Sequence, residues 1–169
     1  RPGPVVVDVP KDVQLQRAKF DPEFDIERGL SRAYDEIPTD TSSLAHLSQR
    51  IASAQRPVLY VGGGIKSSEA WNELRELVER TGIPVTYTLK GKGIFPDTDS
   101  RCVGPLGMHG SVAANYAADA SDLLIVVGAR FDDRVTGDPN QFAHNAYVAH
   151  LDIDPRGIGP KGKRQPEMV

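Results

Sequence analysis

Three short segments carry residue types that could hold a nucleotide cofactor. They are Leu-Gly-Met-His-Gly at 106–110, Gly-Ala-Arg-Phe-Asp-Asp-Arg at 128–134 and His-Leu-Asp-Ile-Asp at 150–154. Each lies at the end of a predicted strand or the start of a predicted helix. In an open α/β sheet, these ends form the crevice in which nucleotides bind. The spacing therefore predicts a cofactor-binding edge rather than a self-contained catalytic site.

The segment 128–134 follows the most apolar strand of the chain. Arg130 could stack on a flat ring or pair with a phosphate. Asp132, Asp133 and Arg134 could instead form a solvated turn with internal ion pairs, which is the usual fate of such a run. A position at the carboxyl end of a strand that is apolar on both faces favours the functional interpretation.

Glycines could admit a ligand at two turns, one within the segment 106–110 and one at 62–64. Gly107 and Gly110 leave room beside the first turn of the next helix, where unpaired N–H groups suit a pyrophosphate. The alternative is that His109 is a solvated loop residue and Met108 fills the core. The glycines at 62–64 could admit a phosphate or could form a tight turn. They match neither G-x-G-x-x-G nor the P-loop spacing.

Asp152 and Asp154 end the last predicted strand. A carboxylate there often accepts hydrogen bonds from ribose hydroxyls, but an Asx turn before Pro155 is the alternative. Two carboxylates at this spacing could bind a metal, yet no other ligand cluster supports a metal site. The sequence also lacks a nucleophile elbow and zinc-ligand spacing, so we predict neither a catalytic residue nor a metal ligand within this chain.

These segments need strands and helices to position them. The sequence predicts strands at 58–61, 84–89, 122–127 and 146–153, which alternate with helices. This alternation predicts an α/β fold with an open parallel β-sheet, a Rossmann-like arrangement with helices on both faces.

Three helices follow from apolar spacing and capping residues. The first follows Thr41, Ser42 and Ser43 and faces inward with Leu44, Leu47 and Ile51. The second is capped by Ser67 or Ser68, faces inward with Ala70, Leu74, Leu77 and Val78, and ends at Gly82. The third begins at Gly110 and Ser111 and faces inward with Val112, Ala113, Tyr116 and Ala117.

The amino-terminal part differs in character. Residues 5–9 predict a short buried strand, whereas 11–40 show no steady period and predict a linker or an arm. The chain opens on Arg1 without an initiator Met, so we expect it to be a piece of a longer polypeptide.

The composition of the chain limits the kinds of partner that it is expected to bind. The 169 residues carry a net charge of −3, which gives no electrostatic case for nucleic acid or an anionic membrane. No apolar run approaches the roughly 20 residues that a membrane helix needs. The single cysteine excludes an internal disulfide and favours a reducing compartment.

Several runs together resemble one enzyme family. They are Pro-Val-Leu-Tyr-Val-Gly-Gly-Gly at 57–64, Thr-Gly-Ile-Pro-Val at 81–85, Leu-Gly-Met-His-Gly at 106–110, Asn-Tyr-Ala at 115–117 and Gly-Ala-Arg-Phe-Asp-Asp-Arg-Val-Thr-Gly at 128–137. They resemble the central domain of acetohydroxyacid synthase (acetolactate synthase), catalytic subunit. Residues 1–12 resemble the end of the preceding domain in thiamine-diphosphate enzymes. The Arg-Phe-Asp-Asp-Arg-Val-Thr-Gly run is the most specific.

The resemblance implies a domain order and a reaction. Residues 1–12 would end the N-terminal pyrimidine-binding domain, 13–40 would be a linker, and 41–169 would be the central FAD-binding domain. The family condenses pyruvate with pyruvate or 2-ketobutyrate, with decarboxylation, in branched-chain amino acid biosynthesis. It uses thiamine diphosphate, Mg²⁺ and FAD. The first two belong to other domains, so this chain alone should be inactive.

The resemblance also implies site residues. Contacts to FAD would fall on Arg1, Gly64, Leu89, Lys90, Gly107, Met108, His109, Gly110, Gly128, Ala129, Arg130, Phe131, Asp132, Asp152 and Ile153. The substrate channel would be lined by Lys11, Met108, Asp133 and Arg134. Arg134 is the candidate partner for the keto-acid carboxylate, which a guanidinium can hold through two hydrogen bonds.

Other interpretations stay open. The chain could come from a pyruvate oxidase or glyoxylate carboligase type of thiamine enzyme. It could also be a non-catalytic nucleotide-binding module or a deacylase-like NAD domain. For the first interpretation we expect a homo-oligomer, with a regulatory subunit as a further partner in the full enzyme. We expect a cytoplasmic location, or a plastid or mitochondrial one in a eukaryote.

Overall fold

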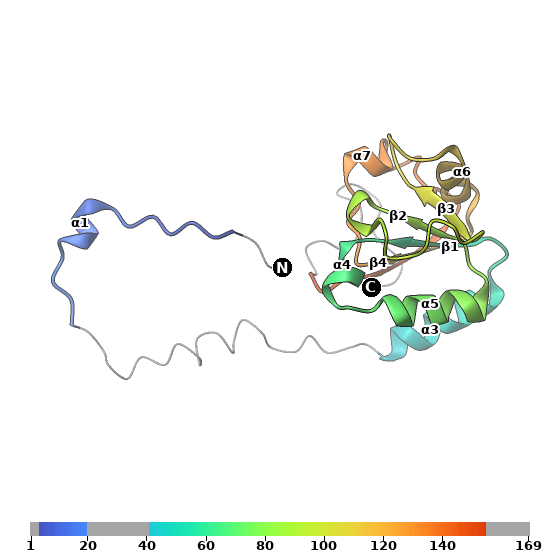
Figure 1. Ribbon diagram of the computed structural model, residues 1–169, viewed down its shortest axis with the longest axis horizontal. Helices are drawn as coiled ribbons and strands as arrows, with labels where there is room; N and C mark the ends of the chain where they lie inside the picture. Colours follow the sequence, from blue (N-terminus) through green and yellow to red (C-terminus); the bar gives the residue numbers. More distant parts are fainter. Residues whose placement is uncertain (1–3, 20–40, 155–169) are drawn as a thin grey trace. The chain divides into compact units, whose positions relative to one another are not determined.

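The computed structural model describes residues 4–19 and 41–154 (Figure 1). The chain divides into two compact units, residues 1–39 and 40–169, and each is described by itself. Within the described ranges, no helix is long and apolar enough to cross a bilayer.

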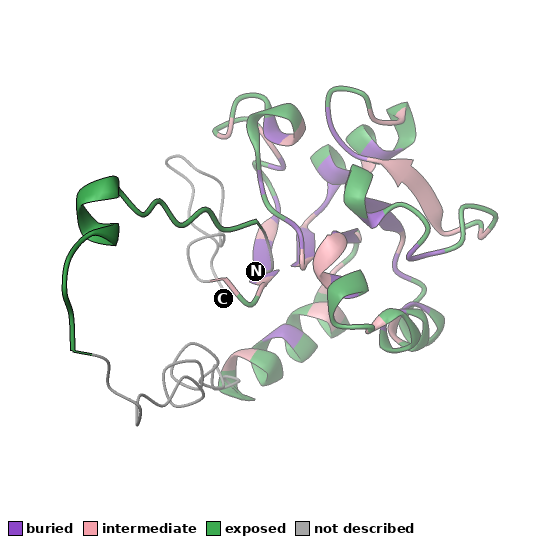
Figure 2. Ribbon diagram, turned by 60° about the vertical axis from the view of Figure 1, so that its left-hand side comes forward, coloured by how far each residue is buried: buried purple, intermediate pink, exposed green. Residues whose placement is uncertain are grey.

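The first unit contains the short helix α1, Lys11–Gln14. Every residue of 4–19 is exposed (Figure 2). The prediction of a buried strand at 5–9 is therefore wrong, and the Val6 side chain is 91% exposed. Three valines favour a strand only where a neighbouring strand and a packed face exist, and the described sheet takes no strand from this segment.

The second unit is built on a five-stranded sheet. Its strands are β1 Pro57–Val61, β2 Val85–Tyr87, β3 Cys102–Pro105, β4 Leu123–Val127 and β5 Tyr147–Leu151. All neighbouring strands are parallel, and their order is β3-β2-β1-β4-β5. The predicted open parallel sheet is confirmed.

Helices cover both faces of this sheet (Figure 1). They are α3 Thr41–Ser53, α4 Gly63–Ser67, α5 Trp71–Thr81, α6 Val112–Ala120 and α7 Asp133–Thr136, with the 3₁₀ helix η1 at Leu89–Gly91. Alternate residues of β1 enter two separate cores. Leu59 packs with residues of α3, α4 and α5, whereas Tyr60 packs with residues of α6 and with Phe131. This alternation places one core on each face.

Helix α6 turns a different face inward from the one predicted. Ala114 and Ala118 are buried, whereas Val112 and Tyr116 are each 72% exposed. The helix is rich in alanine, so a spacing of three to four residues fits either face. The smaller side chains face the sheet and allow the helix to approach it closely. Ser111 caps the helix as predicted, because its Oγ accepts a hydrogen bond from the Ala114 N–H at 3.0 Å.

The start of α5 was also predicted wrongly. Ser67 ends α4 and Ser68 follows it, and their hydroxyls donate back to the carbonyls of Gly63 and Gly64. Helix α5 begins at Trp71 after Ala70, which makes no side-chain cap hydrogen bond. It ends at Thr81, and Gly82 follows in the left-handed conformation as the predicted capping residue. In α3, Leu47 is buried as predicted, but Leu44 is exposed.

Strand β3 was not predicted from the sequence. Its residues, Cys-Val-Gly-Pro, lack alternation and include two residues that are rare inside sheets. The strand lies at the edge of the sheet, where a proline without an N–H is tolerated.

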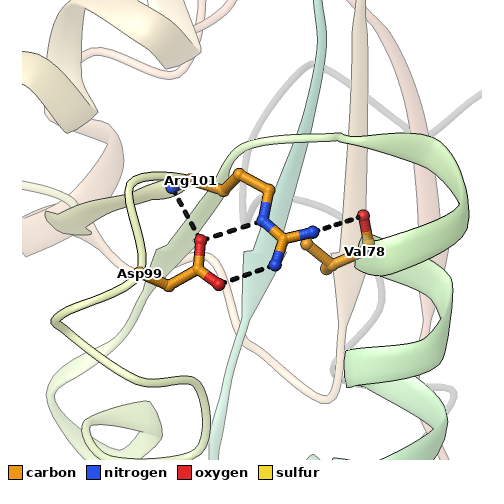
Figure 3. Close-up of polar contacts among 3 residues, drawn as sticks. All are labelled: Val78, Asp99 and Arg101. Atoms are coloured by element: carbon orange, nitrogen blue, oxygen red, sulfur yellow. Dashed lines mark hydrogen bonds and ion pairs between the residues drawn. The ribbon is translucent and has the colours of Figure 1, made fainter.

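Arg101 connects the start of β3 to helix α5 through hydrogen bonds (Figure 3). Arg101 precedes β3 and donates two side-chain hydrogen bonds to Asp99, at 2.8 and 2.6 Å. Its remaining guanidinium nitrogen donates to the carbonyl of Val78 in α5 at 3.1 Å.

Candidate functional site

The strand order reverses between β1 and β4. From β1 the chain proceeds outward to β2 and β3, and it returns to the other side of β1 as β4 and then β5. In open α/β sheets, ligands bind beside the carboxyl ends of the strands at such a reversal. Two loops flank this point: the turn after β1 at 62–64, whose last two residues begin helix α4, and the loop that follows β4 at 128–132.

Glycines in these two loops allow the loops to pack directly against each other. A Cβ on Gly62 would lie 2.4 Å from the carbonyl oxygen of Gly128, and one on Gly64 would lie 2.5 Å from the Gly128 Cα. The Gly64 N–H donates to the Gly128 carbonyl at 2.9 Å. Close backbone contact is therefore sufficient to explain these glycines. A Cβ on Gly63, in contrast, would have the Lys90 Cβ as its nearest neighbour, at 3.2 Å.

The loops after β3 and β4 are joined as well. The Met108 N–H donates to the Arg134 carbonyl at 2.8 Å. Gly107 has a φ of +111°, and a Cβ there would lie 2.7 Å from the same carbonyl oxygen. Asn115 of α6 holds the Gly107 main chain through two hydrogen bonds, at 3.2 and 3.1 Å. Two of the three segments singled out in the sequence therefore meet.

The third segment borders the second. Val127 pairs with Leu151 across β4 and β5, and the Gly128 N–H donates to the Leu151 carbonyl at 2.8 Å. Asp152 follows directly. Its Oδ1 accepts a hydrogen bond from the Asp154 N–H at 2.9 Å, which is the Asx turn considered as the alternative.

The charged run after β4 does not pair within itself. Asp132 Oδ1 accepts a hydrogen bond from the Arg134 N–H at 3.0 Å and caps the short helix α7. In the part of the chain that the structure describes, no ion pair involves Arg130, Asp132, Asp133 or Arg134. All four residues are exposed. The alternative of a turn with internal ion pairs is therefore not what the structure shows.

Not every side chain named in the sequence can reach a ligand. Ala129 and Phe131 are buried, and the Phe131 ring packs against the rings of Tyr60, Phe142 and His150. Only their main-chain atoms remain for a cofactor. Leu89 and Met108 are exposed, as are the side chains of Lys90, His109 and Ile153. Arg1 lies outside the described residues, and Lys11 belongs to the other unit.

Two buried polar residues beneath this edge were given no role from the sequence, although one of them, His150, begins the segment 150–154. The His150 ring donates from Nε2 to the carbonyl of Ala129 at 2.8 Å, because a carbonyl can only accept. The Tyr60 hydroxyl is buried and has no hydrogen-bond partner among the described residues. Burial, with a smaller effect from Asp132, raises the pKa of Tyr60, which therefore stays neutral. Neither residue has a sequence signal that separates it from ordinary strand positions.

Two hollows of the described surface lie away from the loops at 107–110 and 128–134. One, of 550 Å³, lies at the amino ends of β1 and β2, between the carboxyl ends of α3, α5 and α6. Another, of 390 Å³, is lined by residues of α4, α5 and the segment after η1. We place the candidate cofactor site at the carboxyl edge because the strand order reverses there and the loops are hydrogen-bonded to one another. Within residues 4–19 and 41–154, no three His, Cys, Asp or Glu side chains gather as metal ligands.

Comparisons with known proteins agree with this architecture. The model of the family "Thiamine pyrophosphate enzyme, central domain" matches residues 44–168. The chain is 48% identical over 170 residues to the probable chloroplastic acetolactate synthase 2 of Oryza sativa subsp. japonica, covering 99% of this chain and 25% of the relative. It is 50% identical over 166 residues to an acetolactate synthase large subunit of Parasynechococcus marenigrum (strain WH8102), covering 96% and 26%.

An acetolactate synthase large subunit of Porphyra purpurea is 46% identical over 162 residues, covering 94% of this chain and 27% of the relative. The chain thus spans about a quarter of the length of these curated relatives. The family match covers both of the strands that flank the reversal and all of the joined loops. The chain belongs to the thiamine pyrophosphate enzyme family, as a central domain.

Proposed function

We propose that this chain is the FAD-holding central part of an acetolactate synthase. The observation that carries the proposal is the convergence of the loops at one edge. Every candidate residue between 41 and 154 lies in the loop or the short helix that follows the carboxyl end of one of the five parallel strands. Relatives that share about half of the residues are named acetolactate synthases.

The chemistry of this edge suits a flavin dinucleotide. Lys90 and Arg130 are exposed cations that can neutralise a pyrophosphate, and neither forms an ion pair within the described residues. Leu89, 88% exposed, offers an apolar surface for a ring system, as do Met108 and Ile153. The Asp152 carboxylate lies at the end of β5, where ribose hydroxyls are commonly bound.

In the whole enzyme, the proposed reaction joins two pyruvates, or pyruvate and 2-ketobutyrate, with release of one CO₂. Thiamine diphosphate and Mg²⁺, held by other domains, supply the chemistry that breaks and forms the carbon–carbon bonds. The residues of this chain bind and orient. Arg130 holds the cofactor, while Met108, Asp133 and Arg134 line the approach of the keto acid.

Arg130 and Arg134, four positions apart, are proposed to bind different ligands. Arg130 extends from the loop before α7, whereas Arg134 lies within α7 and its carbonyl is held by Met108. A guanidinium can hold a keto-acid carboxylate through two parallel hydrogen bonds. Arg134 is therefore assigned to the substrate and Arg130 to the flavin.

The whole enzyme is expected to assemble as a homo-oligomer and to bind a regulatory subunit. Two of the relatives, from rice and maize, are named chloroplastic, so a plastid is the proposed location if the source is a plant. For any other source, the proposed location is the cytoplasm or a mitochondrion.

Flavin fluorescence tests the cofactor assignment. The 169-residue chain is titrated into FAD, and we expect a saturable change in flavin emission. Titration with NAD is the control, and we expect no displacement of FAD. Retention of NAD in place of FAD would instead support a nucleotide-binding module of another class. Incubation with pyruvate, thiamine diphosphate, Mg²⁺ and FAD should yield no acetolactate from this chain alone.

A further inference from the structure

A second hollow carries features of a ligand site that the proposed function does not use. It has a volume of 390 Å³ and is lined by Lys66, Trp71, Arg75, Lys92, Gly93 and Ile94. This volume falls within the range of small-molecule sites in proteins. None of these residues belongs to the FAD or substrate-channel set assigned above.

Three consecutive parts of the chain build this hollow. Lys66 lies in the last turn of α4, and Trp71 and Arg75 lie one turn apart on α5, so they share a helix face. Lys92 and Gly93 follow η1, and the neighbouring Ile94 is buried. Helix α4 also packs against η1, because Gly63 approaches the Lys90 side chain. The cations are therefore carried by elements that contact one another.

The lining is strongly cationic. Lys66, Arg75 and Lys92 contribute three positive charges, and no carboxylate lines the hollow. Within residues 4–19 and 41–154, none of the three forms an ion pair. The chain as a whole carries a charge of −3, so this concentration of positive charge is local. Like charges that gather without a counter-charge repel one another, and a bound polyanion removes that repulsion.

An aromatic surface lies among these charges. Trp71 begins α5 and is 38% exposed, so part of its indole is accessible to a ligand. Indole faces stack well on flat rings such as nucleobases. The preceding Ala70 makes no side-chain cap hydrogen bond. The first-turn N–H groups of α5 therefore add partial positive charge beside Trp71.

We propose that this hollow binds a nucleoside phosphate, with the phosphate held by Lys66, Arg75 and Lys92 and the base stacked on Trp71. The residues that line the hollow differ from those of the carboxyl-edge loops at 107–110 and 128–134. A ligand here would contact α5 and the segment after η1.

The chain's one tryptophan provides the readout. Tryptophan emission of the 169-residue chain is followed during titration with AMP, with pyrophosphate and with adenosine. We expect AMP to give a saturable change at lower concentration than either other probe, because only AMP combines the base with the phosphate. Added salt should weaken AMP binding, since the charges are near the surface.

Matched variants locate the bound probe. Arg75→Gln or Lys92→Gln should weaken AMP binding about tenfold, which is typical of losing one charge-assisted contact. Arg80→Gln is the control, because Arg80 lies on the same helix, is exposed and pairs with Glu76 outside the hollow. Trp71→Leu, followed by calorimetry, should weaken AMP binding while leaving pyrophosphate binding unchanged.

Three results would overturn the proposal. The first is the absence of a saturable change with AMP at millimolar concentration. The second is equal AMP affinity in the Arg75→Gln, Lys92→Gln and Arg80→Gln variants. The third is a loss of AMP binding in Arg130→Gln but not in Arg75→Gln, which would place AMP at the carboxyl edge instead.

Discussion

Individual glycines in this protein differ sharply in what they tolerate. Gly64 lies in helix α4 against the Gly128 main chain. A Cβ on Gly64 would clash with Gly128 backbone atoms, which cannot move aside as a side chain can. Gly63, its neighbour in the same helix, approaches a flexible lysine side chain. The two residues can therefore be compared directly, because both are half-buried in helix α4 but only Gly64 packs against the Gly128 backbone.

Gly64→Ala should lower the free energy of unfolding by about 1–3 kcal/mol, the usual cost of forcing an extra methyl into a packed site. The matched Gly63→Ala change should alter it by less than about 0.5 kcal/mol. Urea unfolding of the two variants and the parent chain checks this. Equal stability of the two variants would show that the contact with Gly128 is not what requires glycine.

Arg130 and Arg134 should show different functional effects in the full-length enzyme. Arg130→Ala should weaken FAD retention about tenfold, the loss expected for one charge-assisted contact. Arg134→Ala should chiefly raise the apparent KM for the keto acid. Flavin content after gel filtration and steady-state kinetics measure the two effects. The reverse pattern would contradict the proposed roles.

At the scale of whole elements, the edge strand β3 depends on a charged contact. The Arg101 guanidinium and N–H donate to Asp99, and these hydrogen bonds hold the pKa of the Asp99 carboxyl at about 2, below its usual 3.8. A carboxyl whose pKa is lower in the folded state stabilises that state above its unfolded pKa. The stabilisation is lost as the pH falls through the folded value.

Asp99→Asn should therefore lower the unfolding midpoint at neutral pH, and the gap to the parent chain should narrow as the pH falls from about 4 toward 2. Glu76→Gln is the control, since its exposed pair with Arg80 on α5 should contribute little. Urea unfolding across this pH range measures both. A gap that stays constant with pH would contradict the role given to the Asp99 charge.

At the scale of the whole molecule, the two units differ in how much they bury. The described part of the first unit, residues 4–19, contains no buried side chain. The second unit contains both hydrophobic cores, one on each face of the sheet. Its folding should therefore not require residues 1–19.

Deletion of residues 1–19 should leave the thermal unfolding midpoint unchanged. Deletion of residues 41–53 is the contrast, because it removes α3 and with it the buried Leu47, whose burial alone is worth about 2 kcal/mol. Circular dichroism of the two shortened chains checks the difference. A large loss of stability on removing 1–19 would show that this segment packs against the rest.

Much of the second unit was predictable from local patterns. Strands β1 and β4 are short apolar runs bounded by turn residues, and strand alternation with helices indicated a parallel sheet. Strand β3 and the inward face of α6 were not predictable, because Cys-Val-Gly-Pro has no strand signal and alanine fits either helix face. The candidate loops were identifiable because glycines and charges follow apolar strands.

The sequence by itself determined the fold class, the family and the segments that could hold a cofactor, because apolar periodicity and the Arg-Phe-Asp-Asp-Arg-Val-Thr-Gly run are local properties of the chain. Only the tertiary structure decided that Gly64 packs on Gly128, that Met108 binds the Arg134 main chain, and that the Phe131 side chain is buried. The contacts of Gly64 with Gly128, of Met108 with Arg134 and of Phe131 with Tyr60 join residues more than 20 positions apart. Such pairings depend on strand order and register, which no local pattern specifies.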